Sequence, residues 1–243
     1  MPRAVFFDVG NTLLYPYPSV SEVVRRVLED VGHVRDLDAI DTYMPLVDEY
    51  YEDRYREDDT FWRSEEGASG IWVGMYTLLS RKLGIEADAE VIARRVYDEF
   101  GSAKHWKAYP DVEPALERLR ARGITLGVIS NWDSRLRGIL DGLGLAGSFA
   151  TVVSSAEVAL HKPDPRIFEL ACEHVGMAPR ECAHVGDHLY ADVLGAQTAG
   201  MTPVLIDRFD GPAPAESGVR FIRTFDELDG VLGLQSGMGE DAR

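Results

Sequence analysis

Four side chains that could take part in phosphoryl chemistry stand where predicted strands or loops end. Asp8, Ser130 and Asp187 each follow or close an apolar run, and Lys162 lies in the segment HKPDP before a helical pattern. A single Asp or Ser at such a place is typical of a helix N-cap. Four of them in chain order are hard to explain by capping alone. Because ligands bind at the carboxyl ends of parallel strands, these residues predict one shared site.

The chemistry that these residue types suit is phosphoryl transfer. An aspartate can attack phosphorus and form an acyl phosphate, which water then hydrolyses. The phosphate charge must first be neutralised, as Mg²⁺ does when few carboxylates hold it. We expect Asp8 to be the nucleophile and, with Asp187, a ligand of Mg²⁺, while Asp192 supports the metal from one helical turn further on. Lys162 and the Ser130 hydroxyl are expected to hold the remaining phosphate oxygens.

The segments that position these residues alternate between strand and helix patterns. After a first strand at residues 3–8, strands are predicted at 124–130, 149–155, 182–187 and 202–207. Helices are predicted between and after them, at 111–123, 133–145, 164–176, 190–200 and 224–232. Short repeated βα units predict an α/β fold, a Rossmann-like parallel sheet with helices on both faces.

A helical insertion interrupts this alternation directly after the first strand. Apolar residues at helical spacing predict four helices, at 19–32, 38–55, 70–84 and 88–101. We therefore expect a core formed by residues 1–15 and 108–235, with residues 16–107 as a helical cap over the carboxyl edge of the sheet. Residues 236–243 are predicted to be a disordered tail.

The bulk composition limits the partners of the protein. The chain has 243 residues, a net charge of −16 and a pI near 4.7, which argues against nucleic acid or an anionic membrane as a partner. No signal peptide and no membrane-length apolar run is recognised, which predicts a cytoplasmic protein. The phosphoryl-transfer residues predict a small phosphorylated metabolite as its partner. Cys172 and Cys182 are expected to be reduced core thiols, and the oligomeric state is left open.

The order DVGNTL, VISN, KPDP and VGDHLYAD resembles the four motifs of the haloacid dehalogenase-like (HAD) hydrolase superfamily. The insertion is similar to the C1-type cap of that superfamily. The segments ISNWDSRLRGILDGLGL, KPDPRIF and AHVGD resemble, more narrowly, the haloacid dehalogenase-like hydrolase domain-containing protein 3 branch. The resemblance covers residues 8–192 and implies a hydrolase with an aspartate nucleophile.

The resemblance also assigns roles to individual residues. It implies that Asp8 is the nucleophile, Ser130 the hydroxyl of the second motif and Lys162 the lysine of the third, while Asp187 and Asp192 accompany Mg²⁺. Three further implied roles come from the first two motifs: a backbone carbonyl ligand at Gly10, a loop-fixing Thr12 and an Asn131 near the substrate phosphate.

Gly10 departs from the family pattern. Family phosphatases carry aspartate there as the general acid and base, a role typically worth about 10²–10⁴-fold in rate. Its loss should slow poor leaving groups most, so we expect weak activity on ordinary phosphomonoesters. Three groups of relatives lack the acid: 2-haloacid dehalogenases have tyrosine at this position, phosphonatases have alanine and P-type ATPases have threonine. Glycine matches none of these.

The same residues bear on three alternative functions. A dehalogenase needs no metal, and the retained Asp187 and Asp192 argue against that activity. A phosphonatase needs a cap lysine for a Schiff base, whereas Lys82, Lys104 and Lys107 are expected at a helix end or in the hinge. The alternative from a different class is a non-catalytic protein that keeps the fold and binds a phosphate ligand or a partner.

Histidines and aromatic residues near the predicted cleft have ordinary structural interpretations. His105, the best candidate to replace the missing acid, is expected to be an exposed linker residue. The two histidines beside motif residues, His161 and His188, are expected to point elsewhere. Six aromatic residues are expected to pack, four in the core of the cap and two in the hinge: Phe61, Trp62, Trp72, Tyr76, Trp106 and Tyr109.

Overall fold

Six parallel strands form the central sheet of the computed structural model, which describes residues 1–211 and 219–234. The strands lie in the order β5-β4-β1-β6-β7-β8. Their bounds are β1 Ala4–Phe7, β4 Thr125–Ser130, β5 Thr151–Ser154, β6 Cys182–Gly186, β7 Thr202–Ile206 and β8 Arg220–Ile222. The predicted parallel sheet is confirmed. β1 lies near its centre, between β4, which ends at Ser130, and β6, which precedes Asp187.

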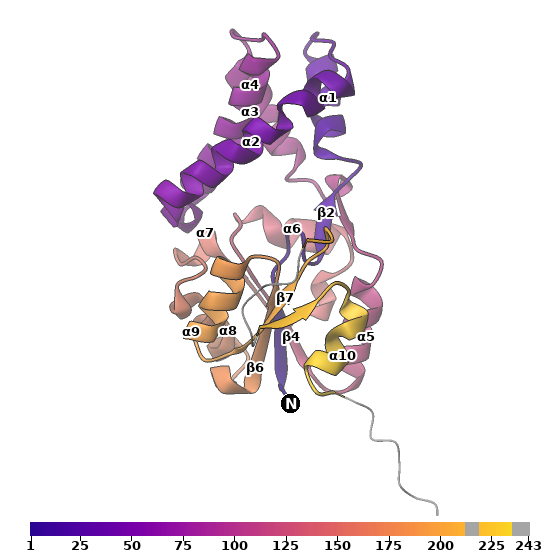
Figure 1. Ribbon diagram of the computed structural model, residues 1–243, viewed down its shortest axis with the longest axis vertical. Helices are drawn as coiled ribbons and strands as arrows, with labels where there is room; N and C mark the ends of the chain where they lie inside the picture. The colour runs from indigo at the N-terminus through magenta and orange to yellow at the C-terminus, as the bar shows by residue number, and fades with distance from the viewer. Residues whose placement is uncertain (212–218, 235–243) are drawn as a thin grey trace, which may run out of the picture.

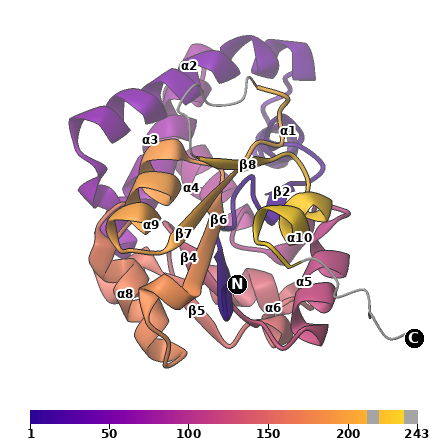
Figure 2. The same cartoon turned by 60° about the horizontal axis from the view of Figure 1, so that its bottom comes forward.

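Helices cover both faces of the sheet, and successive residues of β1 belong to opposite faces. Val5 and Phe7 pack in a cluster with α5 (Val112–Ala121), α6 (Arg135–Gly142) and α10 (Leu228–Val231). Ala4 and Phe6 pack in a second cluster with α8 (Pro165–His174) and α9 (Gly195–Thr198). Figure 2 shows these two groups of helices on opposite sides of the strands. Because β1 is buried on both faces, its position and that of the following Asp8 are fixed from both sides.

Four helices form a separate body beyond the end of the sheet opposite the N-terminus (Figure 1). They are α1 Val20–Asp30, α2 Leu37–Glu57, α3 Glu65–Lys82 and α4 Ala89–Glu99, with a 3₁₀ helix, η1, at Asp59–Arg63. Ser19, Asp36 and Ser64 cap α1, α2 and α3 through their side-chain oxygens. These helices share their own apolar core, so the predicted four-helix insertion is present. We call it the cap.

Two short strands join the cap to the sheet. β2 (Leu14–Pro16) pairs with β3 (Trp106–Ala108) in an antiparallel ladder in which Leu14 faces Ala108. The sequence analysis did not predict these strands. They hold together the two points at which the chain passes between core and cap, close to the predicted boundaries at residues 15 and 108, and the domain division itself stays a prediction.

Several local elements differ from the sequence-based expectation. The helix expected at 190–200 begins as a π-helix, η5 (Leu189–Leu194), and continues as α9. The helix expected at 224–232 consists of a 3₁₀ turn, η6 (Phe225–Glu227), followed by α10. Strand β8 was not predicted, nor were four short helices: η2 Ala103–His105, η3 Ala146–Ser148, α7 Ser155–Val158 and η4 Pro179–Glu181.

Three remaining expectations have different outcomes. Cys172 and Cys182 are buried free thiols, as predicted. None of the described helices is both long enough and apolar enough to cross a membrane. The predicted tail at residues 236–243 lies outside the described residues.

Candidate active site

Asp8 lies directly after β1, where the backbone N–H of Asp8 still donates to the Val185 carbonyl of the neighbouring strand at 2.9 Å. Its carboxylate is almost fully buried. Ser130 Oγ donates to Asp8 Oδ1 at 2.9 Å, and Lys162 Nζ donates to the same oxygen at 2.5 Å. No described residue donates to Oδ2. The protein therefore fixes the carboxylate through one oxygen and leaves the other available to a ligand.

Lys162 is a buried cation, with 2% of its surface exposed, although it comes from a loop. Nζ contacts Asp192 Oδ1 at 2.5 Å as well as Asp8. The side chain of Asn131 holds the backbone of this loop, because its Nδ2 donates to Lys162 O at 3.0 Å and its Oδ1 accepts from Lys162 N at 2.8 Å. These contacts place the ammonium group between two carboxylates.

Asp192 is buried by the π-helical turn that follows β6. Its Oδ1 lies 2.8 Å from His184 Nε2, and its Oδ2 accepts from the backbone N–H of His188 at 3.0 Å. Gly186 makes this approach possible, since a Cβ atom at that position would lie 2.2 Å from Asp192 Cγ. Asp192 is thus held on both oxygens by the protein.

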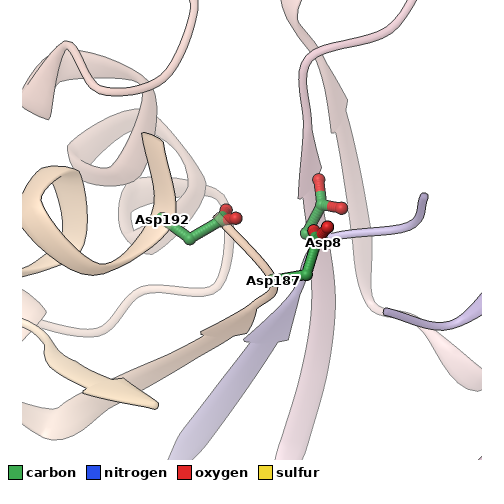
Figure 3. Close-up of side chains that lie close together, drawn as sticks. All are labelled: Asp8, Asp187 and Asp192. Atoms are coloured by element: carbon green, nitrogen blue, oxygen red, sulfur yellow. The ribbon is translucent and has the colours of Figure 1, made fainter. Parts of the chain in front are cut away.

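A third carboxylate, Asp187, completes an acidic cluster. One oxygen from each of Asp8, Asp187 and Asp192 lies within 4.8 Å of the others. Figure 3 shows the three side chains reaching into the same space from the ends of two strands and from the turn after β6. Among the other described residues, only Thr12 forms a hydrogen bond with the Asp187 side chain, from Oγ1 at 3.4 Å, so its oxygens are largely uncommitted.

The donor set of this cluster fits Mg²⁺. Three carboxylates face one lysine, which leaves a formal excess of two negative charges in a site that is mostly buried. A divalent cation neutralises that excess, and carboxylate oxygens are the ligands that Mg²⁺ prefers. Asp8 and Asp187 keep free oxygens for it, whereas both oxygens of Asp192 are occupied. Gly10 borders the same cavity, where its carbonyl would be a further ligand.

Burial and mutual repulsion control the ionisation of these groups. Burial raises the pKa of Asp8 above its ordinary value, opposed by Lys162. Burial, followed by the charges of Asp8 and Asp192, raises the pKa of Asp187 well above its ordinary value. Burial also opposes the charged forms of Asp192 and Lys162, but their mutual attraction lowers the pKa of Asp192 and raises that of Lys162. Asp192 and Lys162 therefore form an ion pair, and Asp187 is the group whose negative charge most needs a cation.

The space beside Gly10 is open. A Cβ atom added at Gly10 would have one neighbour within 4 Å, Trp132 Cζ3 at 3.6 Å, which is an ordinary van der Waals contact. The backbone there is not in the left-handed region, so the position does not require glycine. The fold thus permits an acid at this position, and the sequence does not supply one.

The three histidines near the motif residues and the hinge have different surroundings. His105 is buried, not exposed as predicted, because its Nε2 lies 2.7 Å from Glu99 Oε2 at the end of α4, away from the cavity beside Asp8. His161 points away from that cavity, as expected, and accepts from Arg63 Nε at 2.9 Å. His188 was expected to point elsewhere but borders the cavity, with its Nδ1 accepting from the backbone of Ala191 at 3.1 Å.

A cavity of about 540 Å³ lies between the cap and the carboxyl ends of the strands, and Asp8 is part of its floor. Four of the six aromatic residues predicted to pack in the cap or hinge also line this cavity: Trp62, Trp72, Tyr76 and Trp106. Phe61 and Tyr109 do not line it, and the Tyr109 ring packs on Tyr15 with ring centroids 4.9 Å apart. The cap core and the cavity wall therefore share several side chains.

The sequence analysis missed some residues that border the site or support it. Tyr51, Tyr55 and Trp132 line the cavity, and His184 holds Asp192. One signal for His184 existed: it lies in an apolar strand, where a buried imidazole requires a partner. For Tyr51 and Tyr55, the helical spacing of α2 alone does not distinguish a cavity wall from a core.

A family model described as a haloacid dehalogenase-like hydrolase matches residues 2–200. The chain is 31% identical over 212 residues to haloacid dehalogenase-like hydrolase domain-containing protein 3 of Danio rerio, covering 86% of each chain. It is 33% identical over 223 residues to glyceraldehyde 3-phosphate phosphatase of Methanopyrus kandleri, covering 86% of this chain and 85% of that protein.

Among solved structures, the crystal structure of a HAD phosphatase from Thermococcus onnurineus matches with a TM-score of 0.65 and 28% identity, covering 95% of this chain and 98% of that one. The matched family region includes Asp8, Ser130, Lys162, Asp187 and Asp192, which the structure brings together at one edge of the sheet. The chain belongs to the haloacid dehalogenase-like hydrolase family.

Proposed function

We propose that this hydrolase is an Mg²⁺-dependent phosphatase that cleaves a small phosphomonoester through a phosphorylated Asp8. The observation that carries the proposal is the arrangement of Asp8, fixed by Ser130 and Lys162 through one oxygen beside the uncommitted carboxylate of Asp187. Similarity to a glyceraldehyde 3-phosphate phosphatase supports a phosphate ester as substrate. We place the reaction in the cytoplasm and expect a phosphorylated metabolite, not nucleic acid, as the substrate.

The first step is attack by Asp8 on phosphorus. A bond forms between an Asp8 carboxylate oxygen and phosphorus while the bond from phosphorus to the ester oxygen breaks. The departing oxygen takes the electron pair of that bond and then a proton from solvent, because Gly10 has none to donate. In the second step water attacks the same phosphorus, the bond to Asp8 breaks, and the carboxylate is restored as inorganic phosphate and a proton leave.

The neighbouring residues position the reacting groups. Lys162 and Ser130 are placed to donate to phosphate oxygens as well as to Asp8, which stabilises the charge that builds up during transfer. Asp192 and His184 keep the Lys162 ammonium in place. Thr12 orients Asp187, and Asn131 orients the Lys162 loop from beside the phosphate site.

Mg²⁺ bound by Asp8, Asp187 and the Gly10 carbonyl would neutralise phosphate charge and let a carboxylate approach phosphorus. The helical cap would exclude bulk water from the cavity and select the organic part of the substrate.

A phosphatase assay tests this function. The wild-type protein is assayed with Mg²⁺ against a panel of phosphate esters, with acetyl phosphate included as a substrate that needs no leaving-group acid. The Asp8→Asn variant and the wild type with excess EDTA serve as controls. Turnover that requires both Asp8 and Mg²⁺ is expected, and turnover no higher than that of Asp8→Asn on every ester would reject the proposal.

Gly10 supports one other candidate function, a non-catalytic protein that retains the fold and binds a phosphate ligand or a partner. The Gly10→Asp variant distinguishes the two, because an added Cβ atom meets only an ordinary van der Waals contact there and Gly10 borders the cavity. If the wild type has no measurable turnover and Gly10→Asp gains it, the natural protein is a binder. If the wild type turns over substrates with good leaving groups, it is an enzyme.

A further inference from the structure

The cavity above Asp8 has an aromatic wall. Rings of α2, η1, α3, β3 and the loop after β4 border it: Tyr51, Tyr55, Trp62, Trp72, Tyr76, Trp106 and Trp132. The Trp72 ring stacks with Tyr51 at a centroid distance of 6.4 Å and with Tyr76 at 6.4 Å, with interplanar angles of 23° and 19°. Such a wall suits a flat apolar group, because offset stacking on aromatic rings adds to the free energy gained from burying its surface.

The charges that line the cavity disfavour an anionic organic group. Beyond the acidic cluster, Asp48 and Glu52 of α2 also border it. Lys162 is the one lysine or arginine among the described lining residues, and it is already held by Asp8 and Asp192. A substrate with a carboxylate or a second phosphate would therefore find no uncommitted lysine or arginine at this wall, and it would meet two more carboxylates.

The missing acid at Gly10 favours a particular leaving oxygen. An alkyl ester releases an alkoxide, a base about as strong as hydroxide, so the reaction requires a proton donor. A phenolic ester releases a phenolate, whose conjugate acid has a pKa of about 10, as in tyrosine. The phenolate can leave with the electron pair of the phosphorus–oxygen bond and take its proton from water afterwards.

The aromatic wall and the missing acid thus point independently to the same chemistry. We infer that the substrates are aryl phosphomonoesters, in which the phosphate is joined through a phenolic oxygen to a ring that carries no further negative charge. The inference rests on the proposed function, since it names the substrate class of the same site. The ring lies against the cap wall while the phosphate lies over Asp8.

A matched set of esters separates the two parts of the inference. Phenyl phosphate has an aromatic ring and a phenolate leaving group. Benzyl phosphate keeps the aromatic ring but releases an alkoxide, and cyclohexyl phosphate releases an alkoxide and has no aromatic ring. With Mg²⁺ and the wild-type protein, kcat for phenyl phosphate should exceed that for benzyl phosphate by at least about 100-fold. KM should be lower for both aromatic esters than for cyclohexyl phosphate, and Gly10→Asp should reduce the phenyl-to-benzyl ratio by at least about tenfold.

Variants of the wall test the binding part. Trp72→Leu should raise KM for 1-naphthyl phosphate by about tenfold, and Trp72→Phe, which keeps a ring, should raise it less. Phe209→Leu is the control, because Phe209 is exposed and does not line this cavity. A Trp72→Leu effect that also occurs in Phe209→Leu would contradict the inference.

The failures of the two proposals can be told apart. If benzyl or cyclohexyl phosphate is hydrolysed as fast as phenyl phosphate, and the turnover depends on Asp8, the aryl inference is wrong and the phosphatase proposal stands. If neither acetyl phosphate nor any of the esters is hydrolysed above the Asp8→Asn background, both proposals fail.

Discussion

Asn131 and Lys162 are joined by two hydrogen bonds in which the side-chain amide of Asn131 pairs with the backbone N–H and C=O of Lys162, at 2.8 Å and 3.0 Å. The pairing connects the end of β4 to the loop before α8. Both polar atoms of the Asn131 side chain bind the Lys162 backbone. Asn131 therefore fixes the position of the loop that carries the buried Lys162 ammonium group.

Replacing Asn131 tests this positioning. Asn131→Ala should lower kcat for phenyl phosphate by about 10²-fold, because an error of about 1 Å in a catalytic group can cost that much. Circular dichroism should show an unchanged fold. The control is Gln197→Ala, which removes an exposed side-chain amide of α9 that does not line the cavity. A loss confined to KM in Asn131→Ala would contradict a positioning role.

Lys162 should be essential for stability as well as for activity. Lys162→Met leaves Asp8 and Asp192 without their buried cation, and breaking a buried ion pair typically costs about 3–5 kcal/mol. Urea unfolding of the metal-free protein would measure the loss. Lys82→Met, at an exposed end of α3, should change the free energy of unfolding by less than about 0.5 kcal/mol. Equal stability of the two variants would show that Lys162 is not the cation that holds this cluster.

Mg²⁺ affinity should depend on pH through Asp187. Burial and the neighbouring carboxylates raise the pKa of Asp187 in the metal-free protein, so the folded chain keeps a proton that Mg²⁺ must displace. Lowering the pH through that raised pKa should therefore weaken binding by up to about tenfold per pH unit, and affinity should level off above it.

Calorimetric titration with Mg²⁺ in buffers of different ionisation enthalpy measures the released proton directly. Asp187→Asn should bind Mg²⁺ more weakly and lose most of the pH dependence. If Mg²⁺ binding released no proton at all of the pH values tested from 5 to 8, Asp187 would already be ionised in the metal-free protein throughout that range.

The cap contacts the core beside Lys162. Arg63 of η1 donates to Nδ1 of the buried His161, the residue before Lys162. Arg63→Ala removes this bond, and a typical net hydrogen bond of about 0.5–1.5 kcal/mol predicts a KM raised by about 2–10-fold through weaker cap closure. Arg56→Ala on the exposed end of α2 is the matched control. An unchanged KM in Arg63→Ala would mean that the contact does not contribute to closure.

The sequence was sufficient to predict which strand-end residues meet at this edge of the sheet. Asp8, Ser130 and Asp187 each follow or end a buried strand, and a parallel sheet brings such ends to one edge. The loop that carries Lys162 was placed by its motif. The pairing of Lys162 with two carboxylates needed the three-dimensional structure, because its partners lie 154 and 30 residues away in the chain.

Features that depend on long-range contacts were not predictable. Strands β2 and β3 have three residues each and gain their stability only by pairing across the whole cap insertion. His105 was expected in solvent, yet it is buried against Glu99 because the end of α4 folds back on the hinge. Trp72 and Tyr76 obey the helical spacing of a core, and only the packed cap shows that they also face the cavity.

Trapping of the phosphorylated enzyme would show whether Asp8 is the nucleophile. The protein is mixed with Mg²⁺ and phenyl phosphate, quenched in acid and digested at acidic pH with pepsin, because an acyl phosphate survives in acid. The peptides that contain Asp8 are then analysed by mass spectrometry. The expected result is the added mass of one phosphoryl group, localised to Asp8 and discharged by hydroxylamine, with no adduct and no turnover in Asp8→Asn. Mg²⁺-dependent hydrolysis that persists in Asp8→Asn, or a phosphoryl group on a different residue, would contradict it.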